Sequence, residues 1–196
     1  MIMATIEEIK KLRELTNVSL AQCKKALEQT SGDIEKAQEI LRKWGEDLAG
    51  KVSGRNAGQG IVDAYIHTNK KMGVLIELRC ETDFVARNED FRILAHDLAM
   101  QVAAMNPLYV KEEDVPKEIL DKERAIYQEQ FASTGKPKEI LDKMIEGKLS
   151  KFKEGICLLK QPLVKDPSKK VEDAIKACIA KLGENIYVEK FVKIEI

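Results

Sequence analysis

The chain has 196 residues, of which 33 are Lys or Arg and 33 are Asp or Glu, so its formal net charge is +0. A protein that tracks nucleic acid by charge alone carries an excess of cations, because its affinity comes from counterion release at the phosphates. Charge parity argues against that class of protein, and a hydrophobic fraction of 44% argues against disorder. No apolar run approaches the roughly 20 residues that cross a bilayer, and the N-terminus lacks a signal-peptide core. We therefore expect a cytoplasmic protein without membrane contact.

Three short helices are predicted at the N-terminus. Thr5 and Glu8 have the spacing of a capping box, and a second box follows at residues 19–22. Asp33 is placed to cap a third helix, which we expect to end at Gly45. These helices predict a small bundle near the lower size limit for a domain that folds alone.

Three different elements are predicted in the middle of the chain: a linker, a hairpin and a helix. Between residues 46 and 60 the apolar periodicity disappears and glycines accumulate, which indicates a flexible linker. Two β-rich runs at 61–67 and 74–80 then predict a hairpin. An amphipathic helix follows and is expected to end at Asn106-Pro107.

Charged helices are predicted over most of residues 108–160, and a further amphipathic helix over 171–182. Breaks in the first of these regions are expected near Pro116, at 135–137, and near Gly147 and Gly155.

The last eleven or so residues alternate between apolar and other side chains, which predicts a strand that pairs with the hairpin. We expect one of its faces to be buried, and that face carries Ile186, Val188, Val192, Ile194 and Ile196.

Together these elements predict an α+β fold, in which a three-helix bundle is joined by a linker to a core with a small antiparallel sheet covered by helices. The expected domains are residues 1–45 for the bundle, 46–60 for the linker and 61–196 for the core.

Residues of the kinds used in catalysis or metal binding form no convergent set in the sequence. The cysteines are far apart and make no CxxC pair, and His67 and His96 lie outside any liganding motif. The glycine-rich stretch lacks the spacing of a phosphate-binding loop. We therefore expect no enzyme activity, no metal site and no cofactor.

One polar and aromatic segment, Thr82-Asp83-Phe84-Val85, lies between the hairpin and the following helix. In one interpretation Asp83 caps a turn and Phe84 packs into the core. In the other, a loop presents an acidic group and an aromatic anchor to a partner, an arrangement typical of an interface hot spot. The properties of the residues alone do not choose between the two.

Residues 77–87, Glu-Leu-Arg-Cys-Glu-Thr-Asp-Phe-Val-Ala-Arg, resemble a signature of the translation elongation factor Ts family. Members of this family are guanine-nucleotide exchange factors for elongation factor Tu (EF-Tu). Residues 12–16 and 23–27 resemble the family's other signature, which opens a ubiquitin-associated-like (UBA-like) three-helix domain. Between them the family commonly has Gly-Ala-Gly-Met-Met-Asp, in a loop that contacts the G domain of EF-Tu. This chain has Asn-Val-Ser-Leu-Ala-Gln from Asn17 to Gln22 instead.

The resemblance implies a UBA-like bundle and a protein that binds EF-Tu in its GDP-bound and nucleotide-free forms. It implies that the chain disturbs magnesium and phosphate coordination and so promotes GDP release during translation elongation. The implied partner is a protein rather than a nucleic acid, and short members of the family act as homodimers. The main contacts are assigned to Thr82, Asp83, Phe84 and Val85, and secondary contacts to Leu20, Lys24 and His67.

A different interpretation is an adaptor whose UBA-like bundle binds other proteins without exchange activity. In that case the α+β core would serve only as a scaffold. Capture of a GTPase that is released by GDP or GTP would favour exchange, whereas capture that is insensitive to nucleotide would favour the adaptor.

Overall fold

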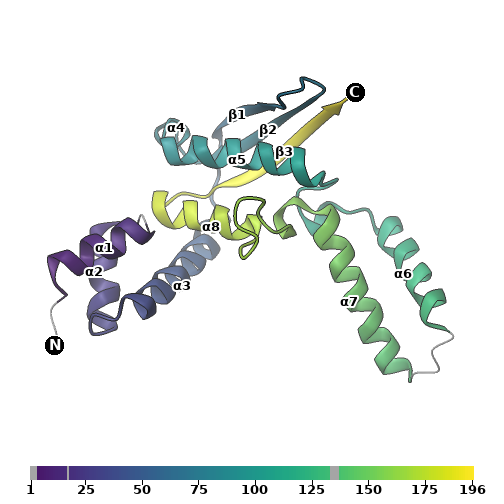
Figure 1. The fold of residues 1–196 in the computed structure, drawn as a ribbon, viewed down its shortest axis with the longest axis horizontal. Coiled ribbons are helices and arrows are strands. Elements are labelled where there is room, and N and C mark those ends of the chain that lie inside the picture. The colour runs from purple at the N-terminus through teal and green to yellow at the C-terminus, as the bar shows by residue number, and fades with distance from the viewer. Residues whose placement is uncertain (1–3, 17, 133–136) are drawn as a thin grey trace. The chain divides into compact units, whose positions relative to one another are not determined.

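A computed structural model describes residues 4–16, 18–132 and 137–196. Within them the chain forms eight α-helices, two short 3-10 helices and a three-stranded antiparallel sheet, so the predicted α+β class is confirmed (Figure 1). Asn17 and residues 135–136, which carried predictions, lie outside the described residues. The elements in chain order are α1 (Ile6–Thr16), α2 (Leu20–Gln29), α3 (Ile34–Val52), β1 (Gln59–Ile66), β2 (Met72–Cys80), α4 (Asp83–Ala86), α5 (Glu89–Met105), η1 (Glu112–Asp114), α6 (Lys117–Ala132), α7 (Lys138–Ile156), η2 (Leu158–Lys160), α8 (Val171–Leu182) and β3 (Tyr187–Glu195).

The chain folds into two compact units. The division passes through β1, β2, α5, α8 and β3. The first unit consists of Met1–Val62, Glu77–Ala95 and Asp173–Tyr187, and the second of Asp63–Ile76, His96–Glu172 and Val188–Ile196. The predicted domains at 1–45, 46–60 and 61–196 stay a prediction.

The N-terminal helices of the first unit begin where their capping residues predict. The Thr5 N–H donates to Glu8 Oε2 at 2.8 Å while the Glu8 N–H donates to Thr5 Oγ1 at 3.2 Å, which is a complete capping box. Asp33 accepts the Lys36 N–H at 3.0 Å and so caps α3. The helices enclose a core of Leu12, Val18, Cys23, Ala26, Leu27, Ala37 and Leu41.

Gly45 does not end the third helix, and that prediction was wrong. The helix α3 continues to Val52, so the first part of the expected linker is helical. Gly45 is buried inside α3, and a Cβ atom added there would come within 2.9 Å of the Ala180 Cβ atom of α8. The glycine therefore permits a close approach of two helices rather than a chain stop.

The sheet has the strand order β1-β2-β3, and in the second unit one of its faces is packed (Figure 1). The His67 N–H donates to the Met72 carbonyl at 2.9 Å and closes the predicted hairpin. Val74 and Ile76 of β2 are fully buried, as are the residues of α5 from Leu98 to Ala99. The α5 helix thus covers one face of the sheet with apolar side chains.

The other face of the sheet is open, which corrects one expectation. Ile186 and Val188 are buried as predicted, but Val192, Ile194 and Ile196 are exposed. Val188 is buried, but further along β3 the less exposed side chains are Phe191 and Lys193, on the face that was expected to be open. The free chain therefore leaves apolar residues of β3 in contact with water.

The helices α6 and α7 pack against each other in the second unit as an antiparallel pair (Figure 1). The expected break near Pro116 is confirmed, because α6 begins at Lys117. The breaks expected at Gly147 and Gly155 were wrong, since α7 runs through both glycines. A Cβ atom at either position would meet nothing within 4 Å, so these are exposed helical glycines. Such a glycine costs only about 1 kcal/mol relative to alanine, which packing elsewhere in the helix outweighs.

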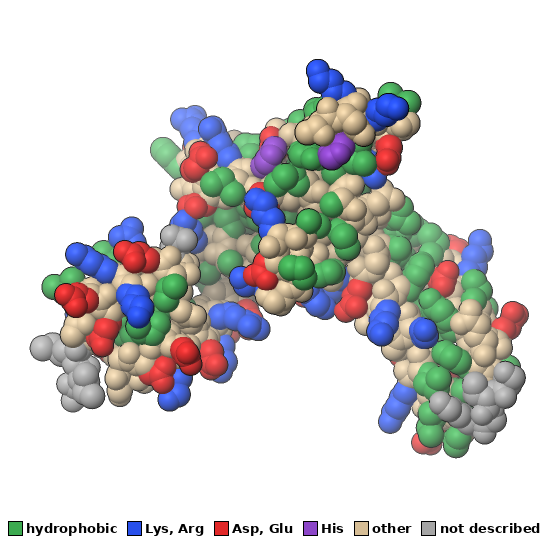
Figure 2. Space-filling model, viewed as in Figure 1, with side chains coloured by type: hydrophobic (Ala, Val, Ile, Leu, Met, Phe, Trp, Pro, Cys, Tyr) green, Lys and Arg blue, Asp and Glu red, His purple; other side chains and the backbone are tan. Residues whose placement is uncertain are grey.

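Charged side chains of both signs are interspersed on the molecular face drawn in Figure 2. This distribution agrees with the equal numbers of acidic and basic residues in the sequence. Across residues 4–16, 18–132 and 137–196, none of the helices combines the length and the apolar character that a bilayer crossing demands.

Candidate functional site

The segment singled out in the sequence forms a single helical turn, α4, that points its aromatic ring outward. The Val85 N–H donates to Thr82 Oγ1 at 3.4 Å, so Thr82 rather than Asp83 caps the turn. Val85 and Ala86 face inward and are buried, whereas Phe84 is 79% exposed. The interpretation in which Phe84 packs into the core is therefore wrong. Because one turn cannot bury all of its side chains, burial of residues 85 and 86 leaves residue 84 in solvent.

Asp83 lies beside Phe84 and is held by an ion pair. Its Oδ2 atom is 2.8 Å from the Arg87 guanidinium, one helical turn further along the chain. Both side chains are largely accessible, so this pair is weak in energy. The carboxylate can exchange Arg87 for another donor without breaking a buried interaction.

The base of the α4 turn is held by Glu184, which lies more than 100 positions away in sequence. Glu184 Oε2 accepts the N–H of Glu81 at 3.1 Å and the N–H of Thr82 at 3.0 Å. Its Oε1 atom accepts the Thr82 hydroxyl at 2.6 Å. One carboxylate thus satisfies two backbone amides and the capping hydroxyl. The sequence patterns did not single out Glu184, because no local spacing links it to residues 81 and 82.

The Glu81 carboxylate in turn binds the segment that contains Glu184. Glu81 Oε1 accepts the Asn185 N–H at 2.7 Å and lies 3.5 Å from the Arg55 guanidinium. The buried Asn185 side chain donates to the Ser53 carbonyl at 3.4 Å and to the Arg55 carbonyl at 2.9 Å. We call Glu81, Thr82, Glu184 and Asn185 the carboxylate clasp.

A buried thiol supports the same turn from below. Cys80 Sγ donates to the Thr82 carbonyl at 3.2 Å. Burial, and to a smaller extent the charge of Glu184, raise the Cys80 pKa to about 11. The thiol is therefore protonated at neutral pH and acts as a hydrogen-bond donor, not as a nucleophile.

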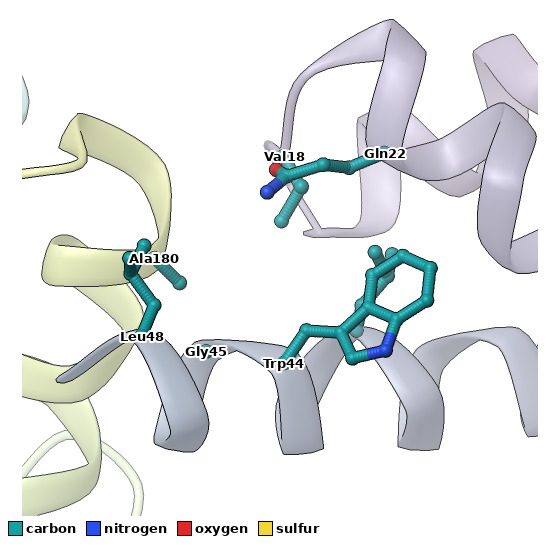
Figure 3. A pocket seen from close by; sticks show the side chains of 7 residues that line it. Val18, Gln22, Trp44, Gly45, Leu48 and Ala180 are labelled. Carbon is teal, nitrogen blue, oxygen red and sulfur yellow. The ribbon is translucent and has the colours of Figure 1, made fainter. Parts of the chain in front are cut away.

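The two candidate residues of the bundle are both accessible. Leu20 is exposed at the first position of α2. Lys24 lies one turn further on and is 3.8 Å from Glu28 in an exposed pair. Nearby, Val18 and Gln22 face Trp44 of α3 across a small hollow that Leu48 and Ala180 also line (Figure 3).

His67, the third secondary candidate, belongs to the second unit. Its Nδ1 atom lies 3.0 Å from the Tyr65 hydroxyl, which orients the imidazole at the end of β1. The Tyr65 ring also contacts His96 edge-on, and His96 Nδ1 is 3.2 Å from Asp63 Oδ2. In the part of the chain that the structure describes, no three His, Cys, Asp or Glu side chains are grouped to hold a metal ion.

Comparison with known proteins places this chain in a family. The model of the family "Elongation factor TS" matches residues 2–196. The chain belongs to the elongation factor Ts family. It is 53% identical over 194 residues to elongation factor Ts of Thermosipho melanesiensis, covering 99% of each chain. It is 53% identical over 192 residues to the Thermotoga maritima protein, covering 98% of this chain and 96% of that one. The corresponding protein of Carboxydothermus hydrogenoformans is 48% identical over 194 residues, with 99% and 89% covered.

Membership of the elongation factor Ts family makes this chain a translation elongation factor rather than an enzyme. The resemblance drawn from residues 77–87 is thereby confirmed. The roles of the individual site residues remain predictions.

Proposed function

We propose that this elongation factor Ts family member is a guanine-nucleotide exchange factor that binds EF-Tu and promotes GDP release. The observation that carries the proposal is the outward position of Phe84, which is 79% exposed on a turn whose base is tied down. Exposure of a large aromatic side chain to water is unfavourable, so a phenylalanine held in solvent is typical of an anchor that a partner protein covers.

The exchange would need no covalent chemistry. An exchange factor binds the nucleotide-free GTPase more tightly than the GDP-bound form. By linkage, bound factor lowers the affinity for GDP by the same factor as bound GDP lowers the affinity for the exchange factor. In our proposal Phe84 inserts between helices of the G domain, while Asp83 leaves Arg87 and accepts hydrogen bonds from groups near the magnesium ion of the GTPase. Thr82 and Val85 hold the turn while these contacts form.

Secondary contacts would come from both units of the chain. We propose that residues 1–45 act as a UBA-like module that docks on the G domain through Leu20 and Lys24. The exposure of both side chains supports this role. His67 would add a contact at the end of β1, with its ring orientation set by Tyr65. Leu20→Ser with Lys24→Glu should then weaken EF-Tu binding without lowering the melting temperature.

A homodimer is also part of the proposal, and the open face of the sheet supports it. The Ile196 N–H donates to the Lys71 carbonyl at 2.9 Å, and continuing this antiparallel register places Leu75 opposite Val192. Ile194 then lies across from Gly73, so exposed apolar side chains of neighbouring strands form one patch. Two such faces can pack together as sheets do in a sandwich, with two-fold symmetry.

Release of fluorescently labelled GDP from EF-Tu, with and without the full chain, tests the proposed function. We expect a release rate that rises with the concentration of the chain and saturates. A matched capture experiment uses immobilised chain and EF-Tu, followed by a wash with GDP. Release of EF-Tu into the wash supports exchange. Unchanged GDP release together with capture that GDP does not reverse would instead indicate the adaptor.

A further inference from the structure

We infer that Glu184 is a positioning residue, which keeps the turn carrying Asp83 and Phe84 rigid while that turn separates elements of its partner. The inference rests on the exchange function proposed above and adds a residue that none of the assigned contacts includes. Glu184 itself does not need to touch the GTPase. It acts through Thr82.

The α4 turn cannot set its own orientation. It contains four residues, Asp83–Ala86, and a helix of that length does not form stably by itself. The two backbone amides that lead into it, those of Glu81 and the N-cap Thr82, both donate to one atom, Glu184 Oε2. The direction of the turn is therefore imposed by a side chain from the far end of the sequence.

Glu184 also determines how the Thr82 hydroxyl is used. A hydroxyl has one proton and two lone pairs, and here the proton is directed to Glu184 Oε1 at 2.6 Å. The lone pairs are then free to accept the Val85 N–H, which is the cap of α4. A short hydrogen bond to a charged oxygen is stronger than a neutral one, so the hydroxyl is held in this orientation. The Glu184 charge thus supports the cap indirectly.

The rest of the carboxylate clasp keeps Glu184 in place. Asn185, its neighbour, is held through its own N–H by Glu81 and through its side chain by the Ser53 and Arg55 carbonyls. The segments at 81–82 and 184–185 therefore each give a carboxylate to the backbone of the other. When Phe84 is pushed by a partner, these reciprocal hydrogen bonds resist displacement of the turn.

Rigidity at the base matters for exchange more than for docking. If the turn yields, Phe84 moves back when it meets the GTPase and the coupling to GDP is lost. A functional side chain that is not held by its neighbours loses effect even when it is present. We therefore expect loss of Glu184 to lower the maximal rate of GDP release while leaving the concentration for half-maximal effect nearly unchanged.

The test uses the full chain with Glu184→Gln, which keeps the size of the side chain but replaces one acceptor oxygen by a donor. Exposed Glu118 of α6 provides the matched control as Glu118→Gln. In stopped-flow release of labelled GDP from EF-Tu, E184Q should lower the maximal rate by about tenfold, the effect of leaving a partly buried donor of residue 81 or 82 without its charged acceptor. E118Q should change it by less than about twofold. A normal maximal rate for E184Q overturns the inference.

A double-mutant cycle separates positioning from a general structural effect. If Glu184 acts through the turn, E184Q should add less than about twofold to the loss in Phe84→Ala. A full tenfold loss in both backgrounds overturns the inference. Glu81→Gln opens the other half of the carboxylate clasp and should show the same dependence on Phe84, which keeps the test valid even if E184Q does not fold.

Hydrogen exchange distinguishes failure of this inference from failure of the proposed function. In free E184Q the amides of Glu81 and Thr82 should lose protection by tenfold or more while those of buried Leu98 in α5 do not. Retained protection at both amides overturns the positioning role. If instead Phe84→Ala leaves GDP release unchanged while E184Q loses this protection, the proposed function fails and the anchoring of the turn by Glu184 stands.

Discussion

Replacing Phe84 with alanine tests the proposed function separately from stability, because the side chain is largely exposed. Phe84 is 79% exposed and Phe91, seven positions later in α5, is 0% exposed. The same substitution at the two positions removes the same ring from two opposite environments. Phe84→Ala should impair GDP release from EF-Tu with little effect on folding, and Phe91→Ala should do the reverse.

The expected magnitudes follow from how much of each ring water can reach. Transfer of a phenylalanine side chain from water into an apolar contact is worth about 1.5–3 kcal/mol. At about 1.4 kcal/mol per factor of ten, loss of that contact in the complex slows release roughly tenfold to a hundredfold. Because Phe84 makes few contacts in the free protein, its removal should change the free energy of unfolding by less than about 0.5 kcal/mol. Removal of buried Phe91 should cost about 3–5 kcal/mol.

Two measurements on each variant check this reasoning. Stopped-flow fluorescence follows release of labelled GDP from EF-Tu at saturating factor, and urea titration gives the free energy of unfolding. If EF-Tu releases GDP as fast with the F84A variant as with the original chain, the proposed insertion of Phe84 into the G domain is refuted. An F84A variant destabilised as strongly as F91A shows that Phe84 contributes to the core, which would remove the reason for assigning it to the partner.

Three further predictions concern packing, chemistry and assembly. Gly45→Ala should destabilise the protein by about 1–3 kcal/mol in urea unfolding despite the better helix propensity of alanine, and Ala180→Gly in the same chain should recover part of the loss; a more stable G45A would contradict the close helix contact. Burial raises the Cys178 pKa to about 12, above that of the unfolded thiol. The free energy of unfolding should therefore be unaffected by this group at neutral pH and fall as the pH rises above about 9, where only the unfolded thiol loses its proton. Alkylation of Cys178 at pH 8, followed by mass spectrometry, should accordingly be at least about a hundredfold slower in the native protein than in urea, and equal rates would contradict its burial. Ile194→Glu should lower the mass in solution measured by light scattering to that of one chain, whereas Ile126→Glu on α6, also exposed, should leave it unchanged; a dimer that survives I194E argues against the open sheet face.

Local structure followed from short-range signals in the sequence. The starts of the N-terminal helices were predictable because a capping side chain bonds to an amide only two or three residues away, as Thr5 and Asp33 do. The hairpin was predictable for a similar reason, since alternation and a turn of few residues suffice to pair neighbouring strands. Helix ends were less predictable, because Gly45 has the same appearance in sequence whether it ends a helix or admits a neighbouring one.

The exposure of side chains could not be read from the same patterns. Alternation placed Val192 and Ile194 on one face of β3, but whether that face is covered depends on where helices from other parts of the chain pack. The same holds for Phe84, whose sequence neighbours allowed both a core role and an interface role. Its direction is set by burial of Val85 and Ala86, which is a matter of three-dimensional packing.

The sequence by itself determined the α+β class, the helix starts and, through residues 77–87, the elongation factor Ts family. Only the tertiary structure decided that Phe84 faces solvent and that Glu184 holds the turn beneath it. The reason is the range of the interactions: caps and alternation act over a few residues, whereas the hydrogen bonds of Glu184 to Glu81 and Thr82 join segments that meet only after the chain has folded.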